Sequence, residues 1–593
     1  MYRAPVDEIV FTLRHVCGLG DLQKNPRHSE LGDDLVDAIV NEAGRFAAEE
    51  IAPLNAVADK HGTPLRDGTV STPPGWREAY HAWIEGGWNG LSADVESGGQ
   101  GLPQMLSAAA MEMWNSGSMA FAIGPTLTIG AVEAMEKHAS DDLKATYLDK
   151  LVSGEWMGTM NLTEPQAGSD LNALRAKAER NDDGTYRIFG QKIFITYGDH
   201  DLTDNIVHMV LARLPDAPAG TRGISMFLVP KFLVNQDGSL GARNDVRVAG
   251  VEHKLGIHGS PTCTMVYGDE GGAIGWLVGE ENKGLACMFT MMNNARLAVG
   301  IQGLGVAERA YQQALHYAID RKQGRAPGDS GEGMSPIARH PDIKRMLLTM
   351  KSKTQVARAI CYACAHAIDM ANVSEDEAGR TFWNERASLL TPIAKALSTD
   401  FGVEVASLGV QIHGGMGYVE ETGAAQHLRD ARIAPIYEGT NGIQSIDLVL
   451  RKLPLSGGEH IKGFIAELKA VAGEVATSNR PEFGATAARL GESVRDLEEA
   501  TGYMLAALAD GRTADALSGA TPYLRVAGLA LGGALLARGA LRSSEEPAER
   551  QAERTLLARS FCETVLGETG GLKSDIVLSA DAIKAFDPEA LAS

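Results

Sequence analysis

The spacing of apolar residues predicts a helical start to the chain. Between Leu35 and Ile51, apolar positions recur three and four residues apart, as on one buried face of an amphipathic helix. The stretch 105–137 is rich in Ala, Met and Leu. We therefore predict an N-terminal helical domain over residues 1–155.

The pattern changes near residue 156. Short runs rich in β-branched and aromatic residues begin at Tyr186, Ile206, Ile224 and Val246, and Gly, Asn, Asp or Pro bound them. These are the signals of strands and turns. We predict a central β-domain over residues 156–285.

Helical periodicity returns after the β-domain. It predicts a helical bundle over 286–452, interrupted by a Gly- and Pro-rich loop at 322–341, and an additional helical domain over 453–593. The apolar run 526–537 is shorter than the ~18 residues that a membrane span needs. We expect it to form a buried helix.

Composition narrows the possible partners. A chain of 593 residues is too long for one core, and three or four domains are expected. Its net charge of −21 disfavours nucleic acid and anionic membranes as partners. The first eight residues have no apolar signal-peptide segment, and the six cysteines are scattered. We therefore expect a cytoplasmic protein.

Cys361 and Cys364 have the spacing of a redox motif, and His366 follows them. They lie within an alanine-rich helical pattern, which favours small core residues over redox chemistry. No second Cys/His pair offers a zinc site. We expect no bound metal.

The most informative stretch is 411–444, where Glu438 precedes Gly439 at the end of a short predicted loop. A glycine at that point allows close approach of a substrate to the backbone. The dipeptide alone could be a surface turn, but the whole stretch resembles the C-terminal signature of the acyl-CoA dehydrogenases. The resemblance implies that Glu438 removes the α-proton of an acyl thioester, that Gly439 lies beside the substrate and that Thr440 contacts FAD.

A second motif, Met160 to Asp170, resembles the first signature of that family. The resemblance places Met160, Leu162 and Thr163 at the flavin, and Gly168 and Ser169 near its pyrophosphate; Ser169 would also lie near the acyl chain. Short hydroxyls and open backbone N–H groups suit such a site. Alone, the motif could also be a plain strand-to-loop turn.

The run Gly190 to Gly198 resembles the family strand whose aromatic residue shields one flavin face. Here the aromatic is Phe194 where the family usually has Trp, so stacking is kept and an indole donor is lost. Thr196 matches the threonine near flavin N5. A buried strand phenylalanine is the alternative interpretation of Phe194.

Further positions follow from the resemblance. Asn293 and Arg296, at the expected opening of a long helix, match residues near CoA and the catalytic loop. A minority branch of the family carries its base just before that arginine, where this chain has Ala295. Arg321 matches an arginine that binds the FAD pyrophosphate, typically of a neighbouring subunit. Gln411 and Gly415 match residues that reach FAD across the same interface.

Some positions depart from the family pattern. Gln323-Gly324 replaces the usual Thr-Phe after Arg-Lys, and His340 and Gly442 stand where relatives have other polar residues. The adenine side of the FAD site is therefore expected to be rearranged.

The resemblance implies an α+β multidomain protein with the acyl-CoA dehydrogenase fold and an extra C-terminal helical domain. It implies FAD-dependent conversion of an acyl-CoA to the trans-2-enoyl-CoA, with electrons passed to an electron-transfer flavoprotein. A homo-oligomer is expected, with a dimer favoured over a tetramer.

The motifs restrict the choice of substrate less than they restrict the type of reaction. The extra length and the variant motifs look most like the dehydrogenases of 3-(methylthio)propanoyl-CoA in bacterial dimethylsulfoniopropionate breakdown. Medium-chain, long-chain and aryl acyl-CoAs remain alternatives, and so does an acyl-CoA oxidase. A non-catalytic flavoprotein of the same fold, like the DNA-associated relatives, would need a basic C-terminal face.

Overall fold

The computed structural model describes residues 2–591, apart from the side chain of Asn293. It divides into two compact units. One comprises residues 1–44, 104–116 and 299–593, and the other comprises residues 45–103 and 117–298.

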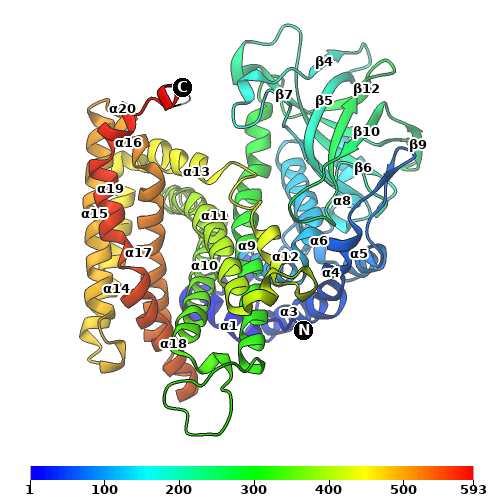
Figure 1. The fold of residues 1–593 in the computed structure, drawn as a ribbon. Coiled ribbons are helices and arrows are strands. Elements are labelled where there is room, and N and C mark those ends of the chain that lie inside the picture. Colours follow the sequence, from blue (N-terminus) through cyan, green and yellow to red (C-terminus); the bar gives the residue numbers. More distant parts are fainter. Residues whose placement is uncertain (1, 592–593) are drawn as a thin grey trace. The chain divides into compact units, whose positions relative to one another are not determined.

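A single large sheet forms the centre of the second unit (Figure 1). Its strands follow the order β10-β11-β5-β12-β7-β6-β3, and β4 pairs with both β5 and β6. The pairing is antiparallel except for β3–β6 and β4–β6. The strands are β3 (Met157–Asn161), β4 (Lys177–Arg180), β5 (Tyr186–Thr196), β6 (Ile206–Arg213), β7 (Ile224–Pro230), β10 (Val246–Val251), β11 (Thr262–Tyr267) and β12 (Ala273–Val278).

Two small hairpins and several helices complete this unit. Gly158 of β3 lies so close to α6 that an added Cβ would come within 2.6 Å of the Ala131 Cβ, so strand and helix pack without a gap. Trp76 of α5 meets Phe121 of α6 edge to face at 5.5 Å. The hairpins are β1 (Leu65–Arg66) with β2 (Thr69–Val70) and β8 (Phe232–Val234) with β9 (Leu240–Arg243); the helices are α4 (Asn55–His61), α5 (Trp76–Glu85), α7 (Asp141–Leu143) and α8 (Asp149–Ser153).

Three helices contribute residues to both units: α3 (Asp33–Phe46), α6 (Gln104–His138) and α9 (Gly284–Asp320). The first unit is otherwise helical to its end. Up to residue 452 it contains α1 (Val6–Phe11), α2 (Leu19–Gln23), α10 (Pro341–Val373), α11 (Glu377–His413), α12 (Ala424–Ala431) and α13 (Asn441–Asp447).

The C-terminal region packs around one apolar helix, α17 (Ala520–Leu541). A Cβ added to Gly532 would come within 2.4 Å of the Val356 Cγ1 on α10, so these helices approach closely because the side chain is missing. Figure 1 shows α14, α15, α17 and α19 side by side. The remaining helices are α14 (Glu459–Thr477), α15 (Thr486–Ala509), α16 (Thr513–Ser518), α18 (Ala548–Ser560), α19 (Glu568–Leu578), α20 (Ala580–Ala585) and α21 (Pro588–Leu591).

Buried ion pairs connect the helices of the first unit. Arg358 of α10 is fully buried and binds Glu112 at 2.5 Å and Glu308 at 2.9 Å. Glu8 of α1 accepts a hydrogen bond from Arg554 of α18 at 2.9 Å. The extra domain is therefore attached to the N-terminal segment by charge as well as by apolar packing.

Several sequence predictions are confirmed at this level. The order of helical, strand-rich and helical regions is as expected, 322–341 is mainly loop, and 526–537 lies inside the buried α17. Cys361 and Cys364 are both fully buried on α10, and burial raises the pKa of the Cys364 thiol to about 12. They are core residues without the reactivity of a redox pair.

Within residues 2–591, two helices are long and apolar enough to cross a membrane, namely α6 and α17. The apolar window of each is mostly buried within the protein, by 94% and 78%. Core helices of proteins without membrane spans have the same length and composition, so this finding is weak evidence for a span.

One sequence expectation about helix bounds is wrong. Asn293 was expected near the start of a helix, but α9 begins at Gly284. The earlier start has a physical reason, because Cys287, Met288 and Met291 pack into the core of the β-unit and continue the helical face. Arg296 consequently lies well inside the helix.

Candidate active site

The loop between α12 and α13 carries Glu438. Its backbone φ is +55°, in the left-handed region that residues other than glycine seldom adopt. Gly439 follows with φ of +86°. Two consecutive left-handed residues turn the chain sharply and leave the Glu438 side chain partly buried. Such strain persists only where the surrounding structure determines the conformation.

Side chains on both flanks of Glu438 hold the loop to helices of the same unit. The Tyr437 hydroxyl donates to Oε1 of Gln302 on α9. Beyond the turn, Oδ1 of Asn441 accepts from Nζ of Lys395 on α11 at 2.8 Å, and Nδ2 of Asn441 donates to the Ala396 carbonyl at 3.1 Å. The conformation at Glu438 is therefore fixed by long-range contacts.

The residues after Glu438 build the start of α13. Oγ1 of Thr440 accepts from the Ile443 N–H at 3.2 Å and so caps the helix. Nε2 of Gln444 donates to the Gly439 carbonyl at 3.1 Å. A Cβ at position 439 would come within 2.8 Å of that nitrogen, which adds to the strain of its positive φ. The left-handed backbone favours glycine there, and any other residue would also have to displace the Gln444 side chain.

The second half of the predicted site lies in the β-unit. Met160 is buried on β3, Leu162 and Thr163 are partly buried, and Gly168 and Ser169 are exposed in the following loop. A Cβ at Gly168 would meet nothing within 4 Å, so this backbone is open.

A buried ion pair holds this loop against β5. Nζ of Lys192 donates to Oε1 of Glu164 at 2.8 Å and to the Leu162 carbonyl at 2.9 Å. The Glu164 carboxylate also accepts from the backbone N–H groups of Arg175 and Ala176, at 2.7 and 3.0 Å. Burial raises the pKa of Glu164, but Lys192 and these donors outweigh it and bring the pKa below its usual value.

Glu164 and Lys192 lie within the two motifs at 160–170 and 190–198, but their pairing was not predicted from the sequence. The available signal was a lone lysine among the apolar residues of a predicted strand. An unpaired charge is not stable in such a place, and a carboxylate partner is required.

Phe194 stands at the end of β5 in an unusual conformation. Its φ is +58° and its side chain is 58% exposed. The alternative of a buried strand phenylalanine is therefore wrong. Thr196 is partly buried, and its carbonyl accepts from Oγ1 of Thr159 on β3 at 2.7 Å. An aromatic ring held out in this way offers its face to a flat partner.

The early part of α9 belongs to the same unit. Ala295 and Arg296 are buried, and Nδ2 of Asn294 donates to Oε1 of Glu133 on α6 at 2.6 Å. The side chain of Asn293 lies outside the described residues.

Three positions expected to serve a neighbouring subunit are exposed in the first unit. Arg321 follows α9, Gln411 lies in the last turn of α11, and Gly415 follows that helix. Among the described residues, the Arg321 guanidinium has no hydrogen-bond or ion-pair partner. Met416 and Tyr418 are also exposed beside Gly415, by 48% and 89%.

The predicted residues are divided between the two units. Glu438, Thr440, Arg321, Gln411 and Gly415 belong to the first unit, and the 160–169 loop with Phe194, Thr196 and Arg296 belongs to the β-unit. Among the described residues, no group of three or more His, Cys, Asp or Glu side chains could hold a metal ion.

Comparison with known proteins decides the family. Four family models match successive parts of the chain: the acyl-CoA dehydrogenase N-terminal domain (34–155), middle domain (159–269) and C-terminal domain (282–453), and the acetyl-CoA dehydrogenase C-terminal like domain (459–587). The chain belongs to the acyl-CoA dehydrogenase family. Enzymes of this family use FAD, and the protein is a FAD-dependent oxidoreductase.

Individual relatives agree. The chain is 44% identical to 3-methylmercaptopropionyl-CoA dehydrogenase of Ruegeria pomeroyi, over 98% of this chain and 99% of the relative. It is 38% identical to a butyryl-CoA dehydrogenase of Syntrophomonas wolfei, over 77% of this chain and 75% of the relative.

Solved structures show the same fold. Caenorhabditis elegans ACDH-11 in complex with C11-CoA matches 95% of this chain and 92% of its own, with a TM-score of 0.77 at 20% identity. Butyryl-CoA dehydrogenase of Megasphaera elsdenii matches 70% of this chain and 97% of its own, with a TM-score of 0.58 at 27% identity.

The described residues fit the flavin that the family implies. On the β-unit, Phe194 presents an exposed ring and the backbone at Gly168 is open; separately, the helical unit presents the guanidinium of Arg321, which the resemblance assigns to the FAD of a neighbouring subunit. A ring face, backbone N–H groups and a cationic fork are the groups that a flavin dinucleotide requires.

Proposed function

We propose that Glu438 is the catalytic base of this acyl-CoA dehydrogenase. The observation that supports this role is the strained turn at Glu438 and Gly439, held by Tyr437 and Asn441. The turn carries a carboxylate beside a residue with no side chain, so a thioester can approach the backbone. A substrate enclosed there would exclude water from the carboxylate and raise its basicity.

The proposed reaction forms a carbon–carbon double bond beside the thioester. Glu438 takes the α-proton, and its backbone N–H donates to the thioester carbonyl oxygen as negative charge develops there. Bound FAD supplies the acceptor for the β-hydrogen, which leaves with its electron pair. The product is the trans-2-enoyl-CoA.

The β-unit holds the cofactor in this proposal. Phe194 would stack against the flavin, while Thr163 and Thr196 would bond its edge and Ser169 would lie near the pyrophosphate. The Glu164–Lys192 pair keeps the loop that carries Thr163 and Ser169 in place. On the helical unit, Thr440 is the residue that the family resemblance assigns to FAD.

The proposed substrate is 3-(methylthio)propanoyl-CoA, giving 3-(methylthio)acryloyl-CoA. The support is the Ruegeria pomeroyi relative, which matches along nearly the whole length of both chains. The butyryl-CoA dehydrogenase of Syntrophomonas wolfei matches a smaller share of this chain, and its sequence identity is lower.

An acyl-CoA panel with an artificial electron acceptor tests this choice. Pentanoyl-CoA is the matched control, because it has a CH₂ in place of the thioether sulfur. A pocket built for the thioether should favour 3-(methylthio)propanoyl-CoA by ~10-fold or more in kcat/KM, the scale on which apolar pockets discriminate similar chains. Equal values would show an ordinary short-chain enzyme, and activity with none of the thioesters would overturn the function itself.

We also propose an electron-transfer flavoprotein as the acceptor in the cell. One solved chain, 26% identical, comes from work on the electron transferring flavoprotein of Acidaminococcus fermentans. Stopped-flow reoxidation separates the alternatives. A dehydrogenase is reoxidised quickly by the flavoprotein and slowly in air, whereas fast reoxidation in air would identify an oxidase.

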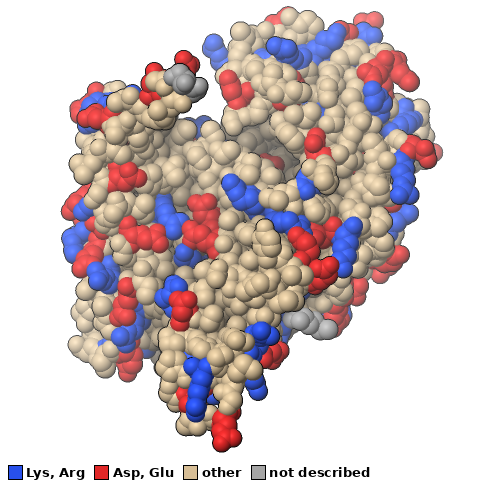
Figure 2. Space-filling model, viewed as in Figure 1, with Lys and Arg blue, Asp and Glu red and all other residues tan. Residues whose placement is uncertain are grey.

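We also propose a cytoplasmic location. All six cysteines are buried free thiols, which suits a reducing compartment. Figure 2 shows acidic and basic side chains interspersed over the C-terminal helices on the face drawn. That mixed surface gives no support to a DNA-associated function.

A further inference from the structure

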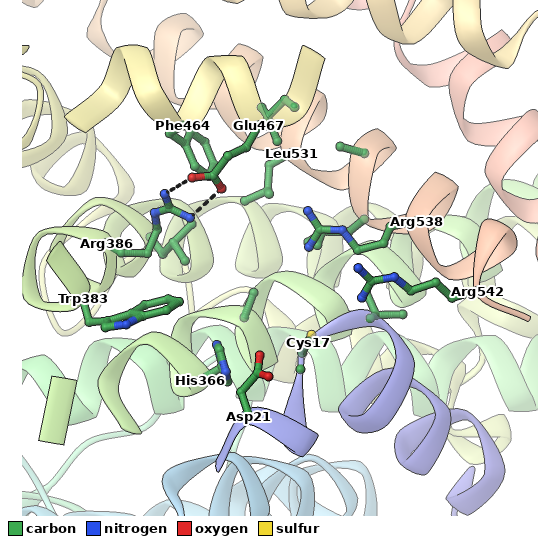
Figure 3. A pocket seen from close by; sticks show the side chains of 17 residues that line it. Cys17, Asp21, His366, Trp383, Arg386, Phe464, Glu467, Leu531, Arg538 and Arg542 are labelled. Carbon is green, nitrogen blue, oxygen red and sulfur yellow. Dashed lines mark hydrogen bonds and ion pairs between the residues drawn. The ribbon is translucent and has the colours of Figure 1, made fainter. Parts of the chain in front are cut away.

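A cavity of about 290 Å³ lies within the helical unit, where the extra domain meets the dehydrogenase helices. Its walls come from the segment before α2, from α10 and α11, and from α14 and α17 (Figure 3). None of the residues assigned to the acyl-CoA or FAD site lines it. It is at the lower end of the size range of small-molecule sites.

One side of the cavity is cationic. Figure 3 shows Arg538, at the end of α17, and Arg542 pointing toward the same open space. Arg538 is partly buried and has no hydrogen-bond or ion-pair partner among the described residues. Burial and the neighbouring charge of Arg542 lower the pKa of Arg538, and the carboxylates of Glu467 and Glu474 offset only part of this lowering. The hydrogen bond of Arg542 runs to the His15 carbonyl, at 3.3 Å.

The nearby carboxylates do not balance this charge. Glu467 already forms a two-pronged pair with Arg386, at 2.9 and 2.6 Å. Asp21 lies on the far side beside His366, and burial lowers the pKa of that histidine to about 4, so it is neutral near pH 7. The cavity lining therefore contains three arginines, Arg386, Arg538 and the exposed Arg542, but only two carboxylates, and one of these is already paired with Arg386.

The remaining wall is apolar. Leu531 and Leu535 of α17, Phe464 of α14 and Trp383 of α11 line it. A cationic end and an apolar body together match an amphipathic anion. Arginine forks bind carboxylates in two-pronged geometry, and the apolar chain gains from burial.

We propose that this cavity is a second ligand site, for a small monocarboxylate with an apolar chain. Its carboxylate lies between Arg538 and Arg542, and its chain lies against Leu531, Phe464 and Trp383. The site is independent of the catalytic assignment above. Because its walls come from both the extra domain and the dehydrogenase helices, bound ligand would also stabilise their packing.

Calorimetry with octanoate on the FAD-loaded full-length protein tests the proposal. Octanoate should bind the wild type and raise its thermal midpoint, and Arg538→Gln should weaken binding by ~10-fold or more, since a charge-assisted bond is lost. Arg538→Lys should weaken octanoate binding less than Arg538→Gln does, because the positive charge remains. The matched control Arg559→Gln removes an exposed arginine of α18 that pairs with Glu563, and should leave binding unchanged.

Two results would overturn the proposal. If Arg538→Gln binds octanoate like the wild type, the acid occupies another site, such as the acyl pocket. If octan-1-ol binds as well as octanoate, the arginines do not select an anion. Should Arg538→Gln fail to fold, Ala534→Leu fills the cavity from α17 without changing charge, and it must abolish the same binding.

Discussion

Glu438 combines a strained backbone with a partly buried carboxylate, and its role can be tested by one substitution. Glu438→Gln keeps the size of the side chain and removes the base. We expect FAD and acyl-CoA binding to persist while flavin reduction by substrate slows by ~10²–10⁴-fold or more. By the family resemblance, a minority of relatives carry the base at the position of Ala295, which has no carboxylate here.

Rapid-reaction absorbance of the flavin measures this rate directly. Glu421→Gln, an exposed carboxylate on the same segment, is the control and should react like the wild type. A rate for Glu438→Gln within ~10-fold of the wild type, well short of the range above, would show that another residue takes the proton.

The Glu164–Lys192 pair shows how one contact positions a loop. Both side chains are almost completely buried, at 3% and 0% exposure. Lys192→Met leaves the carboxylate buried without its cation, a loss on the order of 3–5 kcal/mol. We expect a lower thermal midpoint and weaker FAD retention, measured by fluorimetry and by the flavin absorbance left after gel filtration.

A double variant separates charge from shape. Lys192→Met with Glu164→Gln removes both charges and should recover part of the loss. The matched control is Lys177→Met, which removes an exposed lysine of β4 that pairs with Glu179. It should change the thermal midpoint little. If Lys192→Met retained FAD as well as this control does, the pair would not position the flavin loop.

At the scale of elements, local sequence is a good guide where one pattern dominates. The β-branched runs at Ile206 and Ile224 became β6 and β7, and the apolar run 526–537 became the buried centre of α17. The helical bundle predicted from residue 286 begins with α9 at Gly284, whereas position 293, predicted to open that helix, lies within it. The first turns of α9 are stabilised because Cys287, Met288 and Met291 pack into the core of the β-unit.

The β-unit as a whole should lose stability in acid. His200 and His208 are fully buried, and burial lowers the pKa of each to about 3. The unfolded chain takes up protons below about pH 6.5, whereas the folded chain does not. Their contribution is therefore complete above about pH 6.5 and declines as the pH falls toward 3, by up to ~1.4 kcal/mol per group per pH unit.

The substitution His208→Gln should make the loss of stability with falling pH less steep, because glutamine takes up no proton. The side chain of His208 is neutral in the folded protein: Tyr267 donates its hydroxyl proton to Asn161, so Nδ1 of His208 donates to the Tyr267 oxygen, at 3.2 Å. The thermal midpoint measured from pH 7 to 4.5 should fall less steeply in the variant than in the wild type. His61→Gln, at an exposed histidine, should leave the slope unchanged, and equal slopes for both variants would contradict the assignment to burial.

We expect the whole molecule to be a homodimer or larger. Arg321, Gln411 and Gly415 are exposed near the ends of their helices, and the adjoining Tyr418 is 89% exposed. Light scattering of the FAD-loaded protein measures the mass. Arg321→Ala should weaken FAD retention, whereas Arg339→Ala, in the same loop region and paired with Asp329, should not. A monomer that holds FAD tightly would contradict this prediction.

The sequence by itself determined the order of helical and strand regions, the family motifs and the presence of Glu438 beside Gly439. Periodicity, turn residues and short motifs are local properties, so they can be recognised without a fold. Tertiary structure decided the left-handed backbone at Glu438 and Phe194, the burial of Lys192 against Glu164, and the cavity beside Arg538. Each depends on contacts between residues far apart in sequence, because only packing selects a strained backbone, pairs a buried charge or leaves a space unfilled.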